Sequence, residues 1–99
     1  MGFVQIIEYR TSKYDEVRKL DEEWVAMTKG KTSATRVTQC VDRNDSTRCF
    51  TIVEFPSYEA AMKNSEMPET AAMAEKMGAL CDGPPTFYDL DVNDVQDLA

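Results

Sequence analysis

The sequence contains no histidine among its 99 residues. This absence excludes the Ser-His-Asp triad, the Cys-His nucleophile pair and every mechanism that uses a histidine general base. It also excludes haem held by an axial histidine and most catalytic zinc sites. Any catalysis by this chain has to use other side chains, and the sequence offers no recognisable acid-base pair in their place.

Cysteine is scarce, and occurs only as Cys40, Cys49 and Cys81. An odd count without a CxxC pair argues against a disulfide framework and against a structural zinc site. We interpret the three thiols as small buried apolar groups in a reducing compartment, which favours a cytoplasmic protein. A redox role stays open for Cys40 and Cys49, because a hairpin would bring these two residues near each other.

Basic residues are outnumbered, since 11 lysines and arginines stand against 18 acids and give a net charge of −7. Nucleic acids and anionic membranes are therefore disfavoured as partners. No apolar run is long enough for a membrane helix, and the N-terminal MGFVQIIEYR is typical of a strand rather than a signal peptide. The acidic tail with Asp91, Asp94 and Asp97 lacks calcium-loop spacing, so we expect no metal there.

Hydrophobic residues nevertheless make up 42% of the chain, which is enough for a globular core. The length predicts one domain over residues 1–99, with a core over 3–92 and an acidic tail at 93–99. A domain of this size buries a modest share of its surface and is only marginally stable alone. The sequence shows no internal repeat and no interdomain linker.

Hydrophobic periodicity predicts four strands and two helical regions. Pro68 is expected to open a helix rather than to lie inside one, because proline fits the first helical turn. The predicted strands cover 3–10, 34–42, 49–55 and 86–92, with a polar turn at 43–47; the predicted helices run from an N-cap at Ser12 to about Lys29–Gly30, over 57–65, and from Pro68 to about Leu80.

The order β-α-β-β-α-β predicts a ferredoxin-like α+β fold, a four-stranded antiparallel sheet with its helices on one face. The segment FTIVEF places apolar side chains on both faces of this sheet, because Phe50 and Ile52 point to one face while Val53 and Phe55 point to the other. The helices cover only one of these faces. We therefore expect a second copy of the chain to cover the other, so that a homodimeric α/β barrel forms.

A family resemblance rests on a loose sequence pattern. In this pattern the strand VEF is followed by PSYEAAM, then by NSEMPET, and then by a helix that ends before a short last strand. Over residues 3–92 the chain resembles the dimeric α/β-barrel superfamily, and within it the antibiotic-biosynthesis-monooxygenase-like proteins. The resemblance implies a pocket between sheet and helices. It also implies oxidation of phenolic or quinol-like aromatics by oxygen, with no metal, flavin or other cofactor. The haem-degrading branch is disfavoured because an axial histidine is missing.

The candidate pocket residues are side chains with a polar group and methionines. Trp24 could stack on an aromatic ligand, although packing in the core against the sheet is the simpler interpretation. Asn64 precedes the break at Pro68 and could hold a substrate oxygen, or satisfy backbone groups at the break. The methionines adapt to irregular apolar ligands, or simply fill the core. The full candidate set is Trp24, Asn64, Tyr9, Arg36, Tyr88, Met62, Met73 and Met77.

Two carboxylates, Glu8 and Glu54, fall on strands among apolar neighbours. Either could act as a base with a raised pKa, but we favour pairing with Arg10, Arg36 or Arg48 on an adjacent strand. Three functions remain open: a cofactor-independent oxygenase acting on an apolar aromatic metabolite, a non-catalytic module that binds a small ligand, and a structural dimer without a ligand.

Overall fold

The computed structural model describes residues 2–99, which form one antiparallel sheet and three helices. The strands lie in the order β2-β3-β1-β4, so the two central strands are β3 and β1. The predicted ferredoxin-like order is confirmed. The elements are β1 (Phe3–Arg10), α1 (Tyr14–Thr28), β2 (Arg36–Asp42), β3 (Asp45–Phe55), α2 (Tyr58–Ser65), α3 (Pro68–Leu80) and β4 (Thr86–Asp91).

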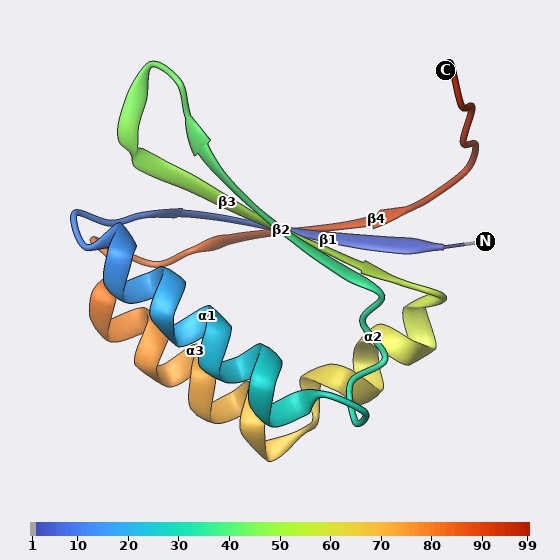
Figure 1. The fold of residues 1–99 in the computed structure, drawn as a ribbon, viewed down its shortest axis with the longest axis horizontal. Helices are drawn as coiled ribbons and strands as arrows, with labels where there is room; N and C mark the ends of the chain where they lie inside the picture. The colour runs from blue at the N-terminus through green and yellow to red at the C-terminus, as the bar shows by residue number, and fades with distance from the viewer. Residues whose placement is uncertain (1) are drawn as a thin grey trace.

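All three helices lie on one side of the sheet, and the other side carries no helix (Figure 1). Helix α3 runs beside α1, while the short α2 lies under the far end of the sheet, and the C-terminal tail leads away from the helices. We call the covered side the helix face and the bare side the open face. None of the described helices is both long enough and apolar enough to cross a membrane.

The strand register assigns each side chain to one of these faces. Phe3 pairs with Phe55, Ile6 with Ile52 and Tyr9 with Cys49 across β1 and β3. Because successive side chains alternate, residues 3, 5, 7 and 9 of β1 lie on the helix face, and residues 4, 6, 8 and 10 on the open face. The prediction that FTIVEF presents apolar side chains to both faces is therefore correct: Val53 and Phe55 are buried beneath the helices, and Phe50 and Ile52 lie on the open face.

The helix-face core consists of two clusters at opposite ends of the sheet. One contains Phe3, Val53, Phe55 and Ala61, and the partly buried Met62 packs against it. The other contains Tyr9, Val17 and Cys49. Between the two clusters the space under α3 is poorly filled, because α3 has no buried residue.

The hairpin between β2 and β3 is tighter than predicted. The polar run at 43–47 was expected to form the turn, but β3 already begins at Asp45. Asp42 accepts a hydrogen bond from the backbone N–H of Asn44, and Asp45 accepts from that of Thr47, so these side chains organise a short reversal. Cys40 and Cys49 are close along the hairpin but lie on opposite faces, since Cys40 pairs with Phe50 and Val41 with Cys49. The expected proximity of the two thiols is therefore wrong.

The start of α1 also differs from the prediction. Lys13, not Ser12, occupies the N-cap position, and no side chain caps the helix there. The hydroxyl of the buried Thr11 instead accepts a hydrogen bond from the Lys13 N–H and donates one to the Leu80 carbonyl. Thr11 thereby ties the start of α1 to the end of α3. Ser57 caps α2 by accepting a hydrogen bond from the Ala60 N–H at 3.1 Å.

Candidate functional site

A cavity lies between the helix face of the sheet and α3, and we call it the inner cavity. Its larger part has a volume of about 310 Å³, at the lower end of the range of small-molecule pockets. A smaller part of about 80 Å³ extends toward α1 and α2. The two parts adjoin each other, because five residues line both: Gln5, Ile7, Thr51, Thr70 and Met73. The larger part is further lined by Tyr9, Met77, Gly78, Cys81 and Phe87, among others, and the smaller by Asp21, Trp24, Val37, Val53, Phe55 and Asn64.

Helix α3 explains why this space is unfilled. Its apolar side is built from alanine, glycine and the slender Met73 and Met77, which line the cavity without closing it. Gly78 has no heavy atom within 4 Å of the position that a Cβ would take. The helix therefore presents a largely apolar wall to a space large enough for a small aromatic molecule.

Polar groups gather at the inner end of the cavity, around Trp24 on α1 and Asn64 on α2. The Trp24 indole N–H donates to the Thr70 hydroxyl at 3.2 Å. Asn64 is only 6% exposed, and its Oδ1 accepts a hydrogen bond from the Thr32 hydroxyl. Asn64 lines the smaller part of the cavity, and its Nδ2 makes no hydrogen bond to another atom of residues 2–99.

A second polar group lies on the sheet floor. The Oε1 atom of Gln39 accepts hydrogen bonds from the Tyr9 hydroxyl at 3.3 Å and from the Thr51 hydroxyl at 2.9 Å. Burial raises the pKa of Tyr9 to about 12, so its hydroxyl stays protonated at neutral pH. Within residues 2–99, Gln39 Nε2 is the one buried side-chain nitrogen or oxygen that lacks a hydrogen-bond partner.

Two further ionisable groups line the inner cavity, Asp21 and Cys81. Burial raises the pKa of the Cys81 thiol, and nearby Asp82 adds to the effect, so the thiol is a poor nucleophile at neutral pH. Burial likewise raises the pKa of Asp21, with a smaller contribution in the same direction from Glu22. The neighbouring Gln39 amide opposes this shift but makes no hydrogen bond of normal geometry with the carboxyl group.

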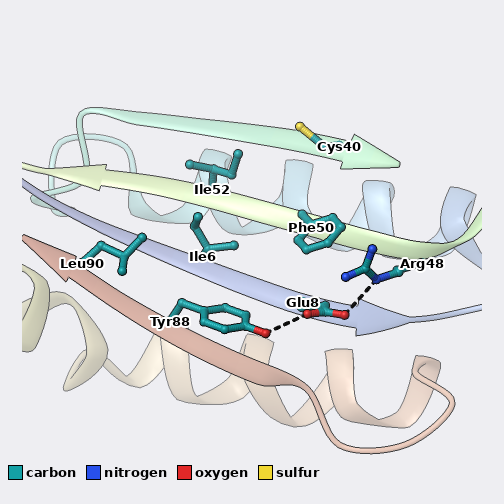
Figure 2. Close-up of a pocket in the computed structure, with 8 residues that line it drawn as sticks. All are labelled: Ile6, Glu8, Cys40, Arg48, Phe50, Ile52, Tyr88 and Leu90. Carbon is teal, nitrogen blue, oxygen red and sulfur yellow. Dashed lines mark hydrogen bonds and ion pairs between the residues drawn. The ribbon is translucent and has the colours of Figure 1, made fainter. Parts of the chain in front are cut away.

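The open face carries a second, shallower depression of about 450 Å³, which we call the outer hollow. Figure 2 shows that its side chains come from all four strands, with Ile6, Ile52 and Leu90 at one end and a charged group at the other. Leu90 is 45% exposed although it is fully apolar. The complete lining is Ile6, Glu8, Cys40, Arg48, Phe50, Ile52, Tyr88 and Leu90.

The charged group of the outer hollow is centred on Arg48. Its guanidinium donates to Glu8 at 2.9 Å and to Asp42 at 3.1 Å, and it lies 4.8 Å from the centre of the Phe50 ring. The Tyr88 hydroxyl also donates to Glu8 at 2.9 Å (Figure 2). The hydrogen bond from Arg48 lowers the pKa of Glu8 most, and the hydrogen bond from Tyr88 lowers it further. The predicted pairing of the strand carboxylates is confirmed, since Glu54 also lies 3.6 Å from Arg36.

The structure divides the candidate residues between these places. Trp24, Asn64, Tyr9, Met73 and Met77 all line the inner cavity.

The remaining three candidates lie elsewhere. Arg36 is exposed on the edge strand and pairs with Glu54. Tyr88 lies in the outer hollow, on the open face. Met62 packs against the Phe3 cluster of the core. Their register on the sheet, and not their residue type, excludes Arg36 and Tyr88 from the inner cavity, because both occupy open-face positions.

The sequence prediction missed several polar residues of this region, among them Asp21, Gln39, Thr51 and Thr70. A signal for Asp21 was present, since it follows Val17 by four residues and precedes Trp24 by three, on the apolar stripe of α1. Gln39 and Thr51 pair across β2 and β3, a contact that only the register reveals. Within residues 2–99 no group of three or more Cys, Asp or Glu side chains is arranged to hold a metal ion.

Comparisons with known proteins identify the fold. No family model matches the sequence, and no curated protein sequence matches it. Among solved structures, the chain is similar to a candidate antibiotic biosynthesis monooxygenase from Caulobacter crescentus, with a TM-score of 0.82 and 14% identity over 94% of this chain and 91% of that one. SnoaB, a cofactor-independent oxygenase from Streptomyces nogalater, gives a TM-score of 0.81 and 12% identity over 95% of each chain.

A third structure, Rv0793 from Mycobacterium tuberculosis, gives a TM-score of 0.80 and 12% identity over 98% of this chain and 100% of that one. The identities are low, whereas the coverage is nearly complete for all three structures. The chain therefore has the ferredoxin-like fold of the antibiotic biosynthesis monooxygenase structures.

Proposed function

We propose that the protein is a cofactor-independent monooxygenase that oxidises a small, largely apolar quinol-type aromatic in its inner cavity. The observation that carries this proposal is the unfilled space beneath α3, with an apolar wall and a polar inner end. An aromatic ring would pack against Met73, Met77 and Phe87, while its oxygen atoms would face the hydrogen-bonding groups near Thr51 and Asn64. The fold shared with SnoaB, whose structures include an asparagine-to-alanine variant, supports the same chemistry.

The chemistry requires no external electron donor. A quinol and O₂ give a hydroxyquinone and water, so one oxygen atom is joined to the ring and the other leaves as water. The four electrons that reduce O₂ all come from the ring. The protein contributes by holding the quinol in one orientation, by excluding bulk water and by placing hydrogen-bond donors near the oxygen atoms that gain negative charge.

Oxygen uptake with 1,4-dihydroxynaphthalene, in buffer that contains a chelator and no flavin, tests this proposal. The wild-type protein should consume oxygen faster than the buffer alone. Trp24→Phe should lower kcat/KM by about tenfold, because it keeps an aromatic side chain, though a smaller one, and removes the N–H that hydrogen-bonds Thr70. Tyr58→Phe is the matched control, since Tyr58 is half exposed and lies outside the cavity. Uptake no faster than in buffer would refute the oxygenase.

The alternative is a non-catalytic module that binds a small molecule in the same cavity. Two of the ionisable groups there, Tyr9 and Cys81, have raised pKa values and stay neutral at pH 7, which suits a binding pocket as well as a reactive one. Such a module would gain thermal stability from the aromatic compound and leave it unchanged. Recovery of the unaltered compound after aerobic incubation would favour this alternative.

We further propose that the working form is a cytoplasmic homodimer closed through the open face. Support comes from the apolar side chains of the outer hollow, where Leu90 and Tyr88 remain 45% and 42% exposed in the single chain. A second sheet would remove them from water, with the favourable free energy that accompanies apolar burial. The three free cysteines fit a reducing compartment.

A further inference from the structure

Asp21 is a carboxylate in a place where a carboxylate is costly. It lies on the side of α1 that also carries the buried Val17, Leu20 and Trp24, and it lines the smaller part of the inner cavity. No lysine or arginine forms a salt bridge with it among residues 2–99. A half-buried charge without a cationic partner loses hydration and gains little in return. The fold therefore leaves the charge of Asp21 without a cation to balance it.

The groups that surround Asp21 come from its own helix and from the elements packed against it. On its own helix, the charged neighbour that acts on it is Glu22. From β2, the neutral Gln39 amide is near its carboxyl group, with Nε2 otherwise unpartnered. The other residues from β1, β3, α2 and α3 that line the smaller part of the cavity carry no ionisable group.

The other ionisable groups of the inner cavity can be excluded as proton acceptors. Within residues 2–99, the cavity-lining side chains that ionise are Tyr9, Asp21 and Cys81. Tyr9 and Cys81 both stay protonated at neutral pH. Asp21 is the one carboxyl group among them, and burial raises its pKa above the ordinary 3.8, so its carboxylate accepts a proton more readily than that of an ordinary aspartate. A base in an enzyme cavity needs this combination.

We propose that Asp21 is the general base that accepts the hydroxyl proton of a quinol bound in the inner cavity. This inference rests on the proposed oxygenase function. The electron pair of the broken O–H bond stays on the quinol oxygen, which makes the ring a better electron donor toward O₂. A carbon–oxygen bond then forms between the ring and one atom of O₂. The O–O bond breaks, and the second oxygen atom leaves as water, with the proton held by Asp21 returned in that step.

The test combines a pH profile with two variants in the oxygen-uptake assay. For the wild-type protein, kcat/KM should rise as the pH increases through the pKa of Asp21, since only the ionised carboxylate accepts a proton. Asp21→Asn should lower kcat by about 100-fold and remove this acidic limb, while quenching of Trp24 fluorescence shows that the quinol still binds. Asp21→Glu should restore part of the rate. Glu16→Gln, at an exposed position one turn earlier on α1, is the control and should leave the rate unchanged.

The possible failures of this test can be told apart. If the wild-type protein consumes no oxygen, the proposed function is wrong and the role of Asp21 is lost with it. If the wild-type protein is active and Asp21→Asn retains its rate within twofold with the same pH profile, only the role of Asp21 is refuted. If Asp21→Asn does not fold, the wild-type pH profile and the Asp21→Glu variant decide. A wild-type profile without an acidic limb contradicts a base at this position, and so does an acidic limb that keeps its midpoint in Asp21→Glu.

Discussion

Polar side chains form two hydrogen-bonded groups in this protein, one on each face of the sheet. On the helix face, Gln39 joins the Tyr9 and Thr51 hydroxyls, so three neighbouring strands share one hydrogen-bonded group. On the open face, Arg48 joins Glu8 and Asp42 in the same way. The first group lies near a cavity and remains incomplete, with Gln39 Nε2 unpaired, whereas the second is fully paired. A buried polar atom without a partner is rare in folded proteins, so the Gln39 amide is the exception on this sheet.

The tight hairpin makes a pH-dependent contribution to stability through Asp45. The Thr47 hydroxyl, the Arg10 guanidinium and the Thr47 backbone N–H all donate to this carboxylate, and in that order they hold its pKa far below 3.8. Because the pKa is lower in the folded chain than in the unfolded chain, this stabilisation is complete above about pH 5 and is lost as the pH falls.

Asp45→Asn should therefore flatten the acidic side of the stability curve. Urea unfolding between pH 5 and pH 2.5 should show a smaller decrease in the free energy of unfolding for this variant than for the wild-type protein. Asp97→Asn in the tail, where the exposed side chain makes none of these contacts, is the control. Parallel pH curves for Asp45→Asn and the wild-type protein would show that the hairpin contacts contribute nothing in solution.

At the scale of elements, helix starts depend on individual side chains that the sequence only partly reveals. Ser57 was expected at the start of α2 and does cap it. Ser12 was expected to cap α1 but is exposed and makes no such contact, because the buried Thr11 has taken over the neighbouring hydrogen bonds. Two serines with the same apparent role thus have different environments.

This difference predicts unequal effects of the same substitution. Ser57→Ala should lower the free energy of unfolding by about 1 kcal/mol, since the Ala60 N–H loses its acceptor. Ser12→Ala should change it by less than about 0.5 kcal/mol, as for other exposed positions. Chemical denaturation of the two variants beside the wild-type protein measures both values, and equal losses would contradict the assignment of the cap.

The sequence was sufficient for the type and order of the elements because the relevant signals are local. Apolar spacing located α1, Pro68 located the start of α3, and alternation located the strands. The start of β3 at Asp45 was missed, since Asp and Ser are poor strand formers and only pairing with β2 makes them extended.

Helix periodicity accounts for three of the five candidates that line the inner cavity; the other two, Tyr9 and Asn64, were chosen for their polar side chains. Trp24, Met73 and Met77 follow from their helical stripes, and they do line the inner cavity. Tyr88 and Arg36 were placed there as well, but their faces depend on a strand register that a one-residue shift would invert. Gln39 and Thr51 could not be singled out because their contact exists only between strands.

At the scale of the whole molecule, the two faces of the sheet carry different functions in our account. The helix face contains the inner cavity, and the open face is proposed to pair with a second copy. Leu90→Glu should weaken this pairing, because it places a carboxylate among the apolar side chains of the outer hollow. Leu98→Glu is the matched control, since Leu98 is 96% exposed in the tail.

Native mass spectrometry separates the outcomes of this comparison. The wild-type protein and Leu98→Glu should give the mass of two chains at micromolar concentration, and Leu90→Glu should give mostly that of one. A wild-type protein that is monomeric under these conditions would refute closure through the open face. A Leu90→Glu dimer as stable as the wild-type dimer would locate the interface elsewhere.

The central claim, that the inner cavity receives an aromatic ligand, can be tested directly because Trp24 is the only tryptophan of the chain and lines that cavity. Its fluorescence should be quenched saturably when 1,4-dihydroxynaphthalene is added without oxygen. Ala74→Phe, which adds a ring at the cavity wall on α3, should weaken the quenching strongly, whereas Ala72→Phe, on the same helix but outside the cavity lining, should not. Quenching that fails to saturate, or that is equal in all three proteins, would contradict the claim.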